Sequence, residues 1–360
     1  MKYNLADVCV RLSSGKGIPA KMIESSGRFP VYGGNGLRGY TEQSNFDGEC
    51  AIIGRQGAFC GNVRFFSGKA YMTEHAIVAV ANKDHNTRYL AYLLSTMSLG
   101  HLSAQSAQPG LSVKTLSKVT VDLPSKEEQD KAVSILSSLE DKIAENSKIN
   151  DNLSDLLQTI YQGQFGKVGL ANNCGILADI CSYSKDKIEI SKLSLDTYYS
   201  TENMLPEKSG AVKATSLPTT SQTTACHKGD TLISNIRPYF KKIVYCEDDC
   251  GCSTDVLCFK PVHPRYTAYL FSTLYADSFF DFMVAGAKGT KMPRGDKQQI
   301  MTYPVVLPSE KDLSEFNSVA TPILTQIYSN RTESERLSAI RDTLLPKLIL
   351  GEIDVSSIQL

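Results

Sequence analysis

One uninterrupted stretch, residues 125–165, limits the folds open to this chain of 360 residues. It contains no Pro or Gly before Gly163, and Pro124 stands directly before it. Ser125 and Glu128 form a capping box, in which the hydroxyl and the carboxylate satisfy amides of the first helical turn. At 1.5 Å per residue, about 40 residues make a helix roughly 60 Å long. Such a helix is typical of a spacer or a dimerisation arm.

Apolar and asparagine side chains recur along this stretch at spacings of three and four, the pattern of a coiled-coil seam. A second stretch repeats the pattern 184 residues later, with Ser309 and Asp312 as a weaker form of the cap. The predicted seam residues are Leu136, Leu139, Ile143, Asn146, Asn150, Leu153, Leu157, Ile160, Ile323, Ile327, Asn330 and Leu337. Asparagines in such a seam cost stability but can fix the register; simple partial exposure is the alternative. Pro322 is expected to kink or delay the second helix, and Pro346 to bend or end it.

The region before the first long helix is repeated before the second one. Residues 306–309 (VLPS) match residues 122–125 (DLPS), and residues 266–273 match residues 89–96 at an offset of 177. We therefore predict an α+β fold in which two mixed α/β domains are separated by two long antiparallel helices that form a coiled coil. The predicted parts are a first domain at 1–124, a first helical spacer at 125–166, a second domain at 167–308, and a second spacer with a C-terminal tail at 309–360.

The distribution of charge is more informative than its sum. The net charge is zero, which by itself argues against a nucleic-acid binder. The four predicted parts, however, carry net charges of +5, −4, +2 and −3, so two basic domains alternate with two acidic helices. This pattern favours two domains that face a polyanion, although ordinary scatter of charge would also produce it. The polar N-terminus, the absence of an apolar run of 18 residues and the ten cysteines without a secretory signal predict a cytoplasmic protein with free thiols.

Motifs of catalysis are absent from the sequence. It contains no phosphate-binding loop, no dinucleotide-binding glycine motif, no zinc-protease helix, no nucleophile elbow and no methyltransferase motif, so we expect a non-catalytic protein without a cofactor of its own. Cys246, Cys250, Cys252 and Cys258, with His227 or His263, could be read as a zinc site. Their spacing differs from paired C-x2-C knuckles, and buried free thiols are the preferred interpretation.

Basic and amide side chains gather on segments rich in turns. Such side chains neutralise phosphates, and Arg, Asn and Gln can also read base edges. The candidate contact residues of the first domain are Asn35, Arg38, Arg55, Gln56, Asn62, Arg64, Gln105, Gln108, Ser112 and Lys114. Those of the second domain are Ser234, Asn235, Arg237, Tyr239, Lys241, Lys242, Lys288, Lys291 and Arg294.

With these motifs in this order and the duplication, the chain resembles, over essentially its whole length, the specificity subunit of type I restriction–modification systems. The matching segments are PVYGGNG at 30–36, LP with the EEQ start of the first spacer at 123–129, ISNIRPYFKK at 233–242, GTKMPRG at 289–295 and LLPKL with GEI at 344–353. Each segment is short and only moderately specific.

The resemblance implies more than the residues alone do. Each domain would read one half of a bipartite double-stranded DNA target, and the paired helices would set the separation of the half-sites. Two methyltransferase (modification) subunits would dock on the chain, carry S-adenosylmethionine and methylate adenine, and restriction/translocase subunits could join them. The alternatives are a specificity chain for a fused methyltransferase–nuclease, a coiled-coil interaction protein without a DNA role, and a catalytic domain of unrecognised type.

Overall fold

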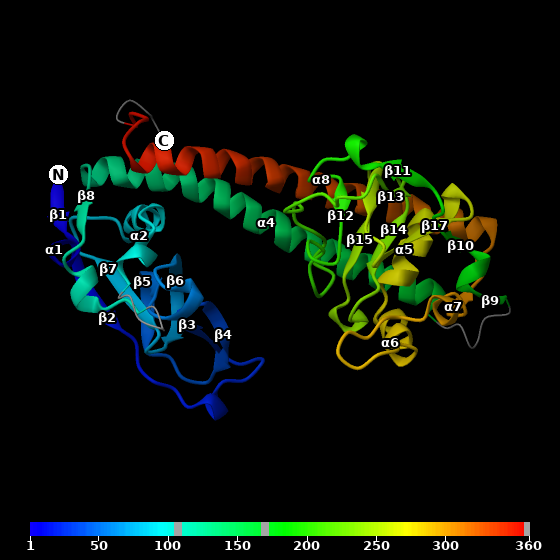
Figure 1. Cartoon of the computed structure of the whole chain (residues 1–360), viewed down its shortest axis with the longest axis horizontal. Coiled ribbons are helices and arrows are strands. Elements are labelled where there is room, and N and C mark those ends of the chain that lie inside the picture. The colour runs from blue at the N-terminus through cyan, green and yellow to red at the C-terminus, as the bar shows by residue number, and fades with distance from the viewer. Residues whose placement is uncertain (104–109, 167–172, 356–360) are drawn as a thin grey trace. The chain divides into compact units, whose positions relative to one another are not determined.

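The structure, a computed structural model, describes residues 1–103, 110–166 and 173–355 (Figure 1). The chain forms two compact units: unit 1 comprises Met1–Ala144 with Ser334–Leu360, and unit 2 comprises Glu145–Glu333. Two long helices, α4 (Lys126–Phe165) and α8 (Glu310–Ile349), run through both. Each unit therefore contains one mixed domain and one part of each long helix.

Unit 1 is built on a six-stranded sheet in the order β2-β7-β5-β6-β3-β4, in which only the β3–β6 pair is parallel. A separate pair, β1–β8, joins the start of the domain to its end. The strands are β1 Lys2–Asn4, β2 Cys9–Ser14, β3 Phe29–Gly33, β4 Gly36–Thr41, β5 Phe46–Gly54, β6 Val63–Met72, β7 Ala76–Ala81 and β8 Thr120–Asp122. The helices are α1 Leu5–Val8, α2 Thr87–Thr96 and α3 Val113–Leu116, with 3-10 turns at Ala20–Met22, Gly57–Phe59 and Leu99–Leu102.

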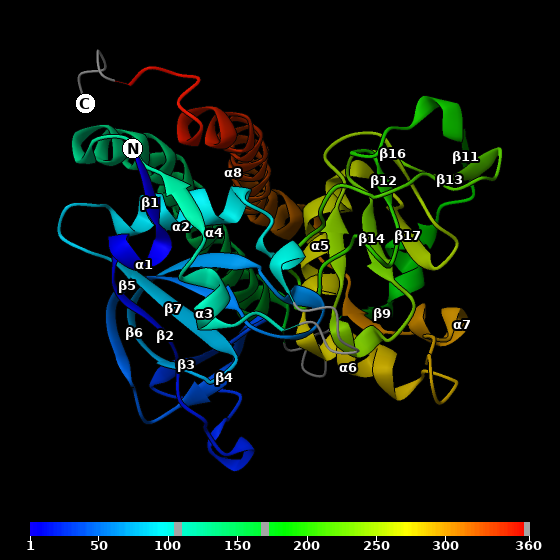
Figure 2. The same ribbon diagram turned by 60° about the vertical axis from the view of Figure 1, so that its left-hand side comes forward.

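The core of unit 1 lies between its sheet, α2 and the two long helices. Figure 2 shows α2 beside the strands. Its buried face includes Tyr89, whose hydroxyl donates a hydrogen bond of 3.2 Å to the carbonyl of Ile349 in α8. Leu136 of α4 is fully buried in the same cluster. α2 ends at Thr96, two residues before Ser98, which adopts a left-handed backbone conformation.

Unit 2 contains two four-stranded sheets, ordered β10-β17-β14-β15 and β11-β13-β16-β12, and the pair β9–β18. The strands are β9 Cys174–Ile176, β10 Cys181–Tyr183, β11 Lys187–Glu189, β12 Tyr198–Tyr199, β13 Gln222–Cys226, β14 Thr231–Ser234, β15 Ile243–Tyr245, β16 Cys250–Cys252, β17 Val256–Pro261 and β18 Pro304–Val306. The helices are α5 Thr267–Tyr275, α6 Asp277–Ala285 and α7 Lys297–Ile300, with 3-10 turns at Leu177–Asp179, Ile190–Lys192, Pro238–Phe240 and Pro264–Tyr266.

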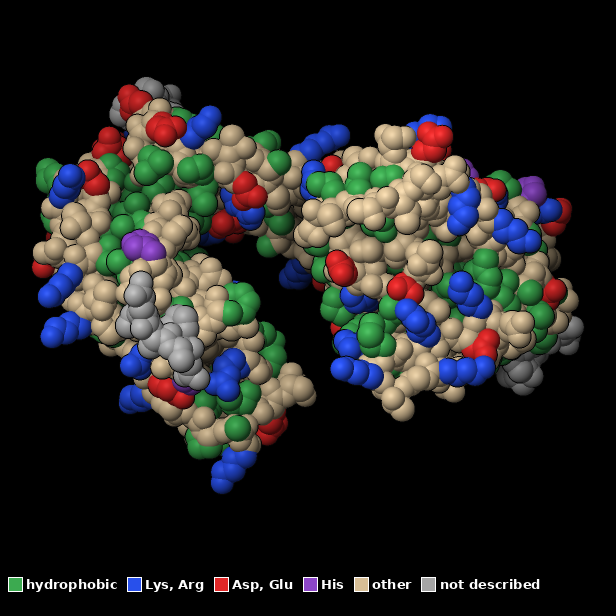
Figure 3. Space-filling view, in the orientation of Figure 1, with side chains coloured by type: hydrophobic (Ala, Val, Ile, Leu, Met, Phe, Trp, Pro, Cys, Tyr) green, Lys and Arg blue, Asp and Glu red, His purple; other side chains and the backbone are tan. Residues whose placement is uncertain are grey.

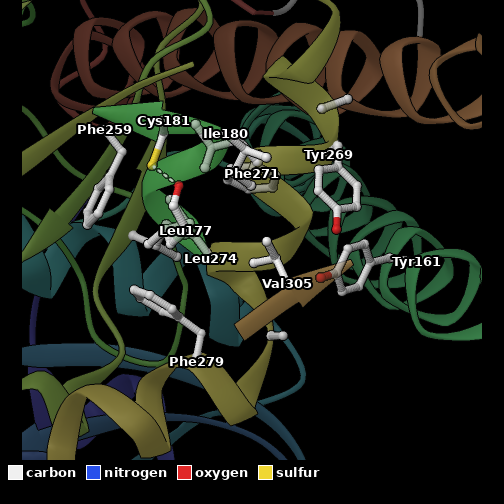
Figure 4. Close-up of a cluster of buried hydrophobic side chains, with 14 of the residues drawn as sticks. Tyr161, Leu177, Ile180, Cys181, Phe259, Tyr269, Phe271, Leu274, Phe279 and Val305 are labelled. Atoms are coloured by element: carbon white, nitrogen blue, oxygen red, sulfur yellow. Dashed lines mark hydrogen bonds between the residues drawn. The ribbon is translucent and has the colours of Figure 1, made fainter. Parts of the chain in front are cut away.

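The core of unit 2 combines aliphatic and aromatic side chains, and Figure 4 shows Tyr161 of α4 beside Tyr269 of α5. The ring of Phe165 in α4 lies 4.9 Å from that of Tyr269 in α5 and 5.5 Å from that of Phe316 in α8, both edge to face. Tyr161 packs against the same two rings. Because edge-to-face rings add to the gain from burial, this cluster fixes the position of the domain on its helices.

The repeat seen in the sequence is also a repeat of structure. The pair β1–β8 corresponds to β9–β18, α2 to α5, and α3 to α7, while central strands β5 and β7 correspond to β14 and β17. The second sheet of unit 2 has no counterpart of the same order in unit 1. The two domains therefore share a frame and differ in what is inserted into it.

Both long helices begin with the reciprocal cap that their sequences predict. The Ser125 amide donates to Glu128 Oε2 at 2.8 Å and its hydroxyl to the same oxygen at 2.6 Å. The corresponding distances from Ser309 to Asp312 Oδ2 are 3.2 and 2.7 Å. These hydrogen bonds lower the pKa of both carboxyl groups.

The prolines of the second helix neither delay its start nor end it. α8 begins at Glu310, well before Pro322, and continues past Pro346 to Ile349. The expectations that Pro322 delays the helix and that Pro346 ends it are therefore wrong. The cap at Ser309 and the buried residues on either side, such as Phe316 and Leu324, keep the helix intact although each proline removes one backbone donor.

Among the predicted seam residues, Asn146, Asn150 and Asn330 lie where α4 and α8 contact each other in unit 2. Leu136, Asn146, Leu157, Ile323 and Asn330 are buried, and the remaining ones are half-buried. The helices run antiparallel, since residues early in α4 meet residues late in α8.

The asparagines of the seam are joined by hydrogen bonds in unit 2. Asn330 Nδ2 donates to Asn150 Oδ1 at 2.9 Å, and Asn150 Nδ2 donates to the carbonyl of Ile327 at 3.1 Å. Asn146 Nδ2 donates to Glu333 Oε2 at 2.7 Å. A slip of either helix would leave these buried amides without partners, which supports a role in fixing the register.

Candidate nucleic-acid interface

The candidate residues of unit 1 lie at one end of its sheet. They come from the β3–β4 turn, the end of β5, the start of β6 and the segment before α3. The carbonyl of Arg55 accepts a hydrogen bond of 2.8 Å from the amide of Leu111, and Gln56 forms a β-bridge with Gly110. Gly34 of the β3–β4 turn approaches the backbone at Arg55 so closely that a side chain at 34 would collide with the carbonyl of His75.

The arginines of this end of the sheet differ in how far they are engaged. Arg64 is exposed, and its guanidinium lies over Gly36, where a Cβ atom would collide with it. Arg38 is exposed and packs along Gly33. Within the described residues, neither of these side chains forms an ion pair. Arg55 is half-buried, and its Nη1 donates to the carbonyl of Glu74 at 3.4 Å. Arg38 and Arg64 are therefore available to an anion.

The other predicted residues of unit 1 fall into two groups. Asn35, Gln56, Asn62 and Lys114 are exposed. Ser112 is exposed as well, but its hydroxyl caps α3 by accepting from the amide of Thr115 at 2.9 Å. A helix cap explains this serine without a ligand. Gln105 and Gln108 lie outside the described residues.

In unit 2, two loops are tied together at the end of β14. One comprises residues 235–242, and the other residues 286–296. The Arg237 amide donates to the carbonyl of Pro293 at 2.8 Å, and the Gly295 amide donates to the carbonyl of Asn235 at 3.2 Å. Ile236 and Lys288 each form a β-bridge with Arg294. The structure thus brings together candidates that are more than 50 residues apart in sequence.

Most basic side chains of these loops already have acceptors. Lys241 Nζ lies 2.8 Å from Asp277 Oδ1, and Lys288 Nζ lies 2.6 Å from Asp296 Oδ2. Arg294 pairs with an Asp255 oxygen at 3.1 Å. The Lys242 ammonium donates to the carbonyl of Thr201 at 2.6 Å, and burial lowers its pKa.

Lys291 and Arg237 remain without an ion pair among the residues that the structure describes. Lys291 is exposed, whereas Arg237 is half-buried and its Nε has no hydrogen-bond partner there. Figure 3 shows Lys and Arg side chains along the lower edge of unit 2, near α6 and the loop after it. These loops therefore form a mixed surface in which only part of the positive charge is free.

Ser234 and Asn235 are buried. The Ser234 hydroxyl donates to the carbonyl of Ile236 at 3.3 Å, and the backbone amide of Asn235 donates to the backbone carbonyl of Asp255 at 2.8 Å. These two residues shape the loop rather than extend from it. Sequence reasoning missed Asp277, which holds Lys241 and Lys208 at 2.8 Å each, because a single acidic residue at a helix start carries no local signal.

The two candidate surfaces are built from equivalent parts. At an offset of 180, residues 55 and 56 of unit 1 correspond to residues 235 and 236 of unit 2. At the offset of 184, residues 110 and 111 correspond to residues 294 and 295. The bridge Gln56–Gly110 thus corresponds to Ile236–Arg294, and the bond between residues 111 and 55 corresponds to that between 295 and 235. In both units, a central strand end is joined to the segment before α3 or α7.

Cysteines and helices elsewhere bear on the remaining expectations. All ten cysteines are free thiols, and the sulfurs of Cys246 and Cys250 lie 3.6 Å apart in a buried cluster. Within 1–103, 110–166 and 173–355, no group of three or more His, Cys, Asp or Glu side chains is arranged to hold a metal ion. No helix in the described part of the chain combines the length and the apolar character needed to cross a membrane.

Several known proteins are similar to this chain in sequence or in fold. The family profile described as the type I restriction modification DNA specificity domain matches residues 1–155. The EcoprrI specificity subunit of Escherichia coli is 36% identical over 163 residues, which is 42% of this chain and 41% of that subunit. The MjaIX specificity subunit of Methanocaldococcus jannaschii is 22% identical over 76% of this chain and 70% of its own length. The type I S subunit from M. genitalium has the same fold, with a TM-score of 0.65 at 17% identity over 97% of this chain and 95% of that one.

The fold of two mixed domains with two long helices is therefore the fold of the M. genitalium S subunit. Residues 1–155 match the type I restriction modification DNA specificity domain, and the chain is similar in sequence to specificity subunits of type I restriction enzymes. Its alignment with the E. coli subunit spans about two fifths of that protein's length.

Proposed function

We propose that the chain is a non-catalytic DNA-recognition subunit that reads a bipartite target, one half-site per domain. The observation that carries the proposal is the construction of the two candidate surfaces from equivalent strand ends and loops, joined by equivalent hydrogen bonds. The surfaces differ in side chains, so the half-sites should differ in sequence.

In this proposal, two adenine methyltransferase subunits that carry S-adenosylmethionine assemble with the chain, and restriction/translocase subunits join the complex for cleavage. The partial pairing of the lysines in unit 2 supports such a division of labour. A surface whose positive charge is mostly occupied gains little from phosphates, so the partners would supply much of the backbone contact.

Methylation sequencing of a host that produces the chain with its methyltransferase tests the proposal. A split, asymmetric adenine-methylated sequence is the expected result. Replacement of residues 1–124 by the first domain of another family member should change one half-site and leave the other. Methylation of all adenines alike would refute the proposal, and a change in both half-sites would refute the assignment of one half-site to each domain.

The long helices are proposed to set the distance between the half-sites. Polar replacement of Leu139, Ile143 and Leu153 should alter the spacing of the methylated sequence or prevent assembly with the methyltransferase. Replacement of the exposed α4 residues Ser138 and Asn152 by Gln is the matched control. Unchanged spacing and assembly in the triple variant would rule out the role of the helices as a ruler.

A further inference from the structure

A strained turn lies in the middle of the unit 2 surface. Arg237 and Lys241 have φ angles of 51° and 50°, in the left-handed region that residues with a side chain usually avoid. Between them runs the 3-10 turn Pro238–Phe240. Two left-handed residues that flank one turn of 3-10 helix give the chain a compact tip, and each is a strained backbone conformation that the surrounding structure has to hold.

Unit 1 contains the same turn at an offset of 180. Gly57 and Gly61, the counterparts of Arg237 and Lys241, have φ angles of 80° and 83°, and the 3-10 turn Gly57–Phe59 begins at the first of them. The bond that closes each loop is also the same, since the Gly54 amide donates to the carbonyl of Asn62 at 2.8 Å and the Ser234 amide to that of Lys242 at 3.2 Å. The turn is therefore a repeated element.

Each turn carries an exposed aromatic side chain at the same position. Phe59 is 46% exposed, and Tyr239, its counterpart at the offset of 180, is 47% exposed. In unit 2 the next residue, Phe240, is exposed as well, to 36%. In the sequence, Phe59 lies between the candidate contacts Gln56 and Asn62, and Tyr239 lies between Arg237 and Lys241. A large ring in water costs hydrophobic free energy, and its presence at the same point of both domains calls for a common use.

The tips are held rigid by different means. In unit 1, Gly61 approaches the backbone of Leu99 and Gly100 so closely that no side chain fits there. In unit 2, the amides of Glu207 and Lys208 donate to the carbonyls of Phe240 and Lys241 at 2.8 and 3.0 Å.

A carboxylate also stabilises the unit 2 turn at residues 237–241. Asp277 accepts from the ammonium groups of both Lys208 and Lys241, which lowers the pKa of Asp277 to about 2. A side chain on a rigid tip loses little entropy when it binds, and this suits it to specific recognition.

We propose that Phe59 and Tyr239 are specificity-determining residues that place their rings against bases of the DNA, one in each half-site. The inference rests on the proposed function and deepens it. A ring can stack on an exposed base or contact a thymine methyl group, and it adds a contact that charge cannot make. Arg64 and Lys291, which form no ion pair within the described residues of their units, would hold the phosphates while the ring contacts the bases.

The test uses the full chain assembled with its methyltransferase and duplex oligonucleotides that contain the identified target. A parallel set of duplexes has one half-site or the other substituted. The first variants are Phe59→Ala and Tyr239→Ala. Val10→Ala and Val262→Ala are the matched controls, because both residues are more exposed than the rings and lie at the opposite end of their sheets.

Each alanine variant should lower kcat/KM for methylation about tenfold or more, the size of a lost base–aromatic contact. The preference for the correct sequence should fall at one half-site only, and at opposite half-sites in the two variants. Phe59→Tyr and Tyr239→Phe should keep most of the preference, because they keep the ring.

Two results would overturn the inference while leaving the proposed function intact: a normal bipartite methylation pattern in which the alanine variants stay within twofold of the controls, or an equal loss at both half-sites. Absence of any bipartite pattern in the unmodified complex would instead reject the proposed function itself. Equal melting temperatures of variants and controls would show that the change lies in recognition and not in folding.

Discussion

The pairing of lysines in unit 2 makes a quantitative prediction about the salt dependence of DNA binding. Lys291 is exposed and has no ion pair within the described residues, whereas Lys241 is held by Asp277 at 2.8 Å and is only 28% exposed. A cation that neutralises one phosphate adds about −0.9 to the slope of log K against log salt concentration. Between 50 and 200 mM salt, this corresponds to roughly a 3.5-fold change in affinity for each phosphate contact.

Fluorescence anisotropy of a labelled target duplex, titrated with the complex at several salt concentrations, measures this slope. Lys291→Gln should reduce its magnitude by about 0.9, while Lys241→Gln should leave the slope within error of the unmodified complex. The slope separates the two effects because a mere loss of stability in the Lys241 variant lowers the active fraction equally at all salt concentrations. Equal reductions of the slope in both variants would show that Lys241 leaves Asp277 and binds a phosphate of the DNA. The inferred difference between paired and free lysines would then be wrong.

Four further outcomes concern stability. Leu157→Ala should lower the free energy of unfolding by about 2–5 kcal/mol, whereas the adjacent exposed Leu156→Ala should change it by less than about 0.5 kcal/mol, as measured by urea denaturation. Asn330→Ala should cost about 1 kcal/mol in the same assay, because it removes a buried amide that hydrogen-bonds Asn150 and Gln326. Ser125→Ala should cost about 1 kcal/mol through the lost hydrogen bonds of the capping hydroxyl with Glu128. Because the folded pKa of Asp277 is depressed to about 2 from 3.8, its contribution should be complete above about pH 5 and fade as the pH falls toward 2; Asp277→Asn should flatten this part of the stability–pH curve.

Local rules explain which parts of the structure the sequence could reveal. The capping boxes and the three-and-four spacing of the seam depend on residues within one or two helical turns, so α4 could be predicted nearly to the residue. The prolines misled about where α8 begins and ends because a single proline is a local signal. The packing around α8 comes from residues distant in sequence, in unit 2 near Pro322 and in unit 1 near Pro346.

The candidate surfaces could be predicted only in outline. Residue type indicated Arg64 and Lys291, but it could not show that Lys241 is occupied by Asp277, or that Ser112 caps a helix, since both depend on tertiary placement. Phe59 escaped notice because a phenylalanine among glycines looks like an ordinary turn. A sequence comparison at the offset of 180 would have aligned it with Tyr239.

The changing offset of the repeat shows where the two domains diverged. In each domain the first strand pairs with the last, Tyr3 with Val121 in unit 1 and Gly175 with Val305 in unit 2. The offset is therefore 172 between the first strands and 184 between the last strands. The central strands and the aromatic turn give 180, so insertions fall between the first strand and the centre, and again after the centre.

The first of these insertions accompanies the second sheet of unit 2, β11-β13-β16-β12, which unit 1 lacks in this form. The turn with its aromatic residue lies between the insertions and keeps its length, its left-handed residues and its closing hydrogen bond. Glycine supplies the conformation in unit 1. In unit 2, where Arg237 and Lys241 must be forced into it, Asp277 holds one of the two. The two units thus reach the same turn conformation with different residues. This is most simply explained if the function of both domains requires the conformation itself, because it sets the position of the aromatic ring.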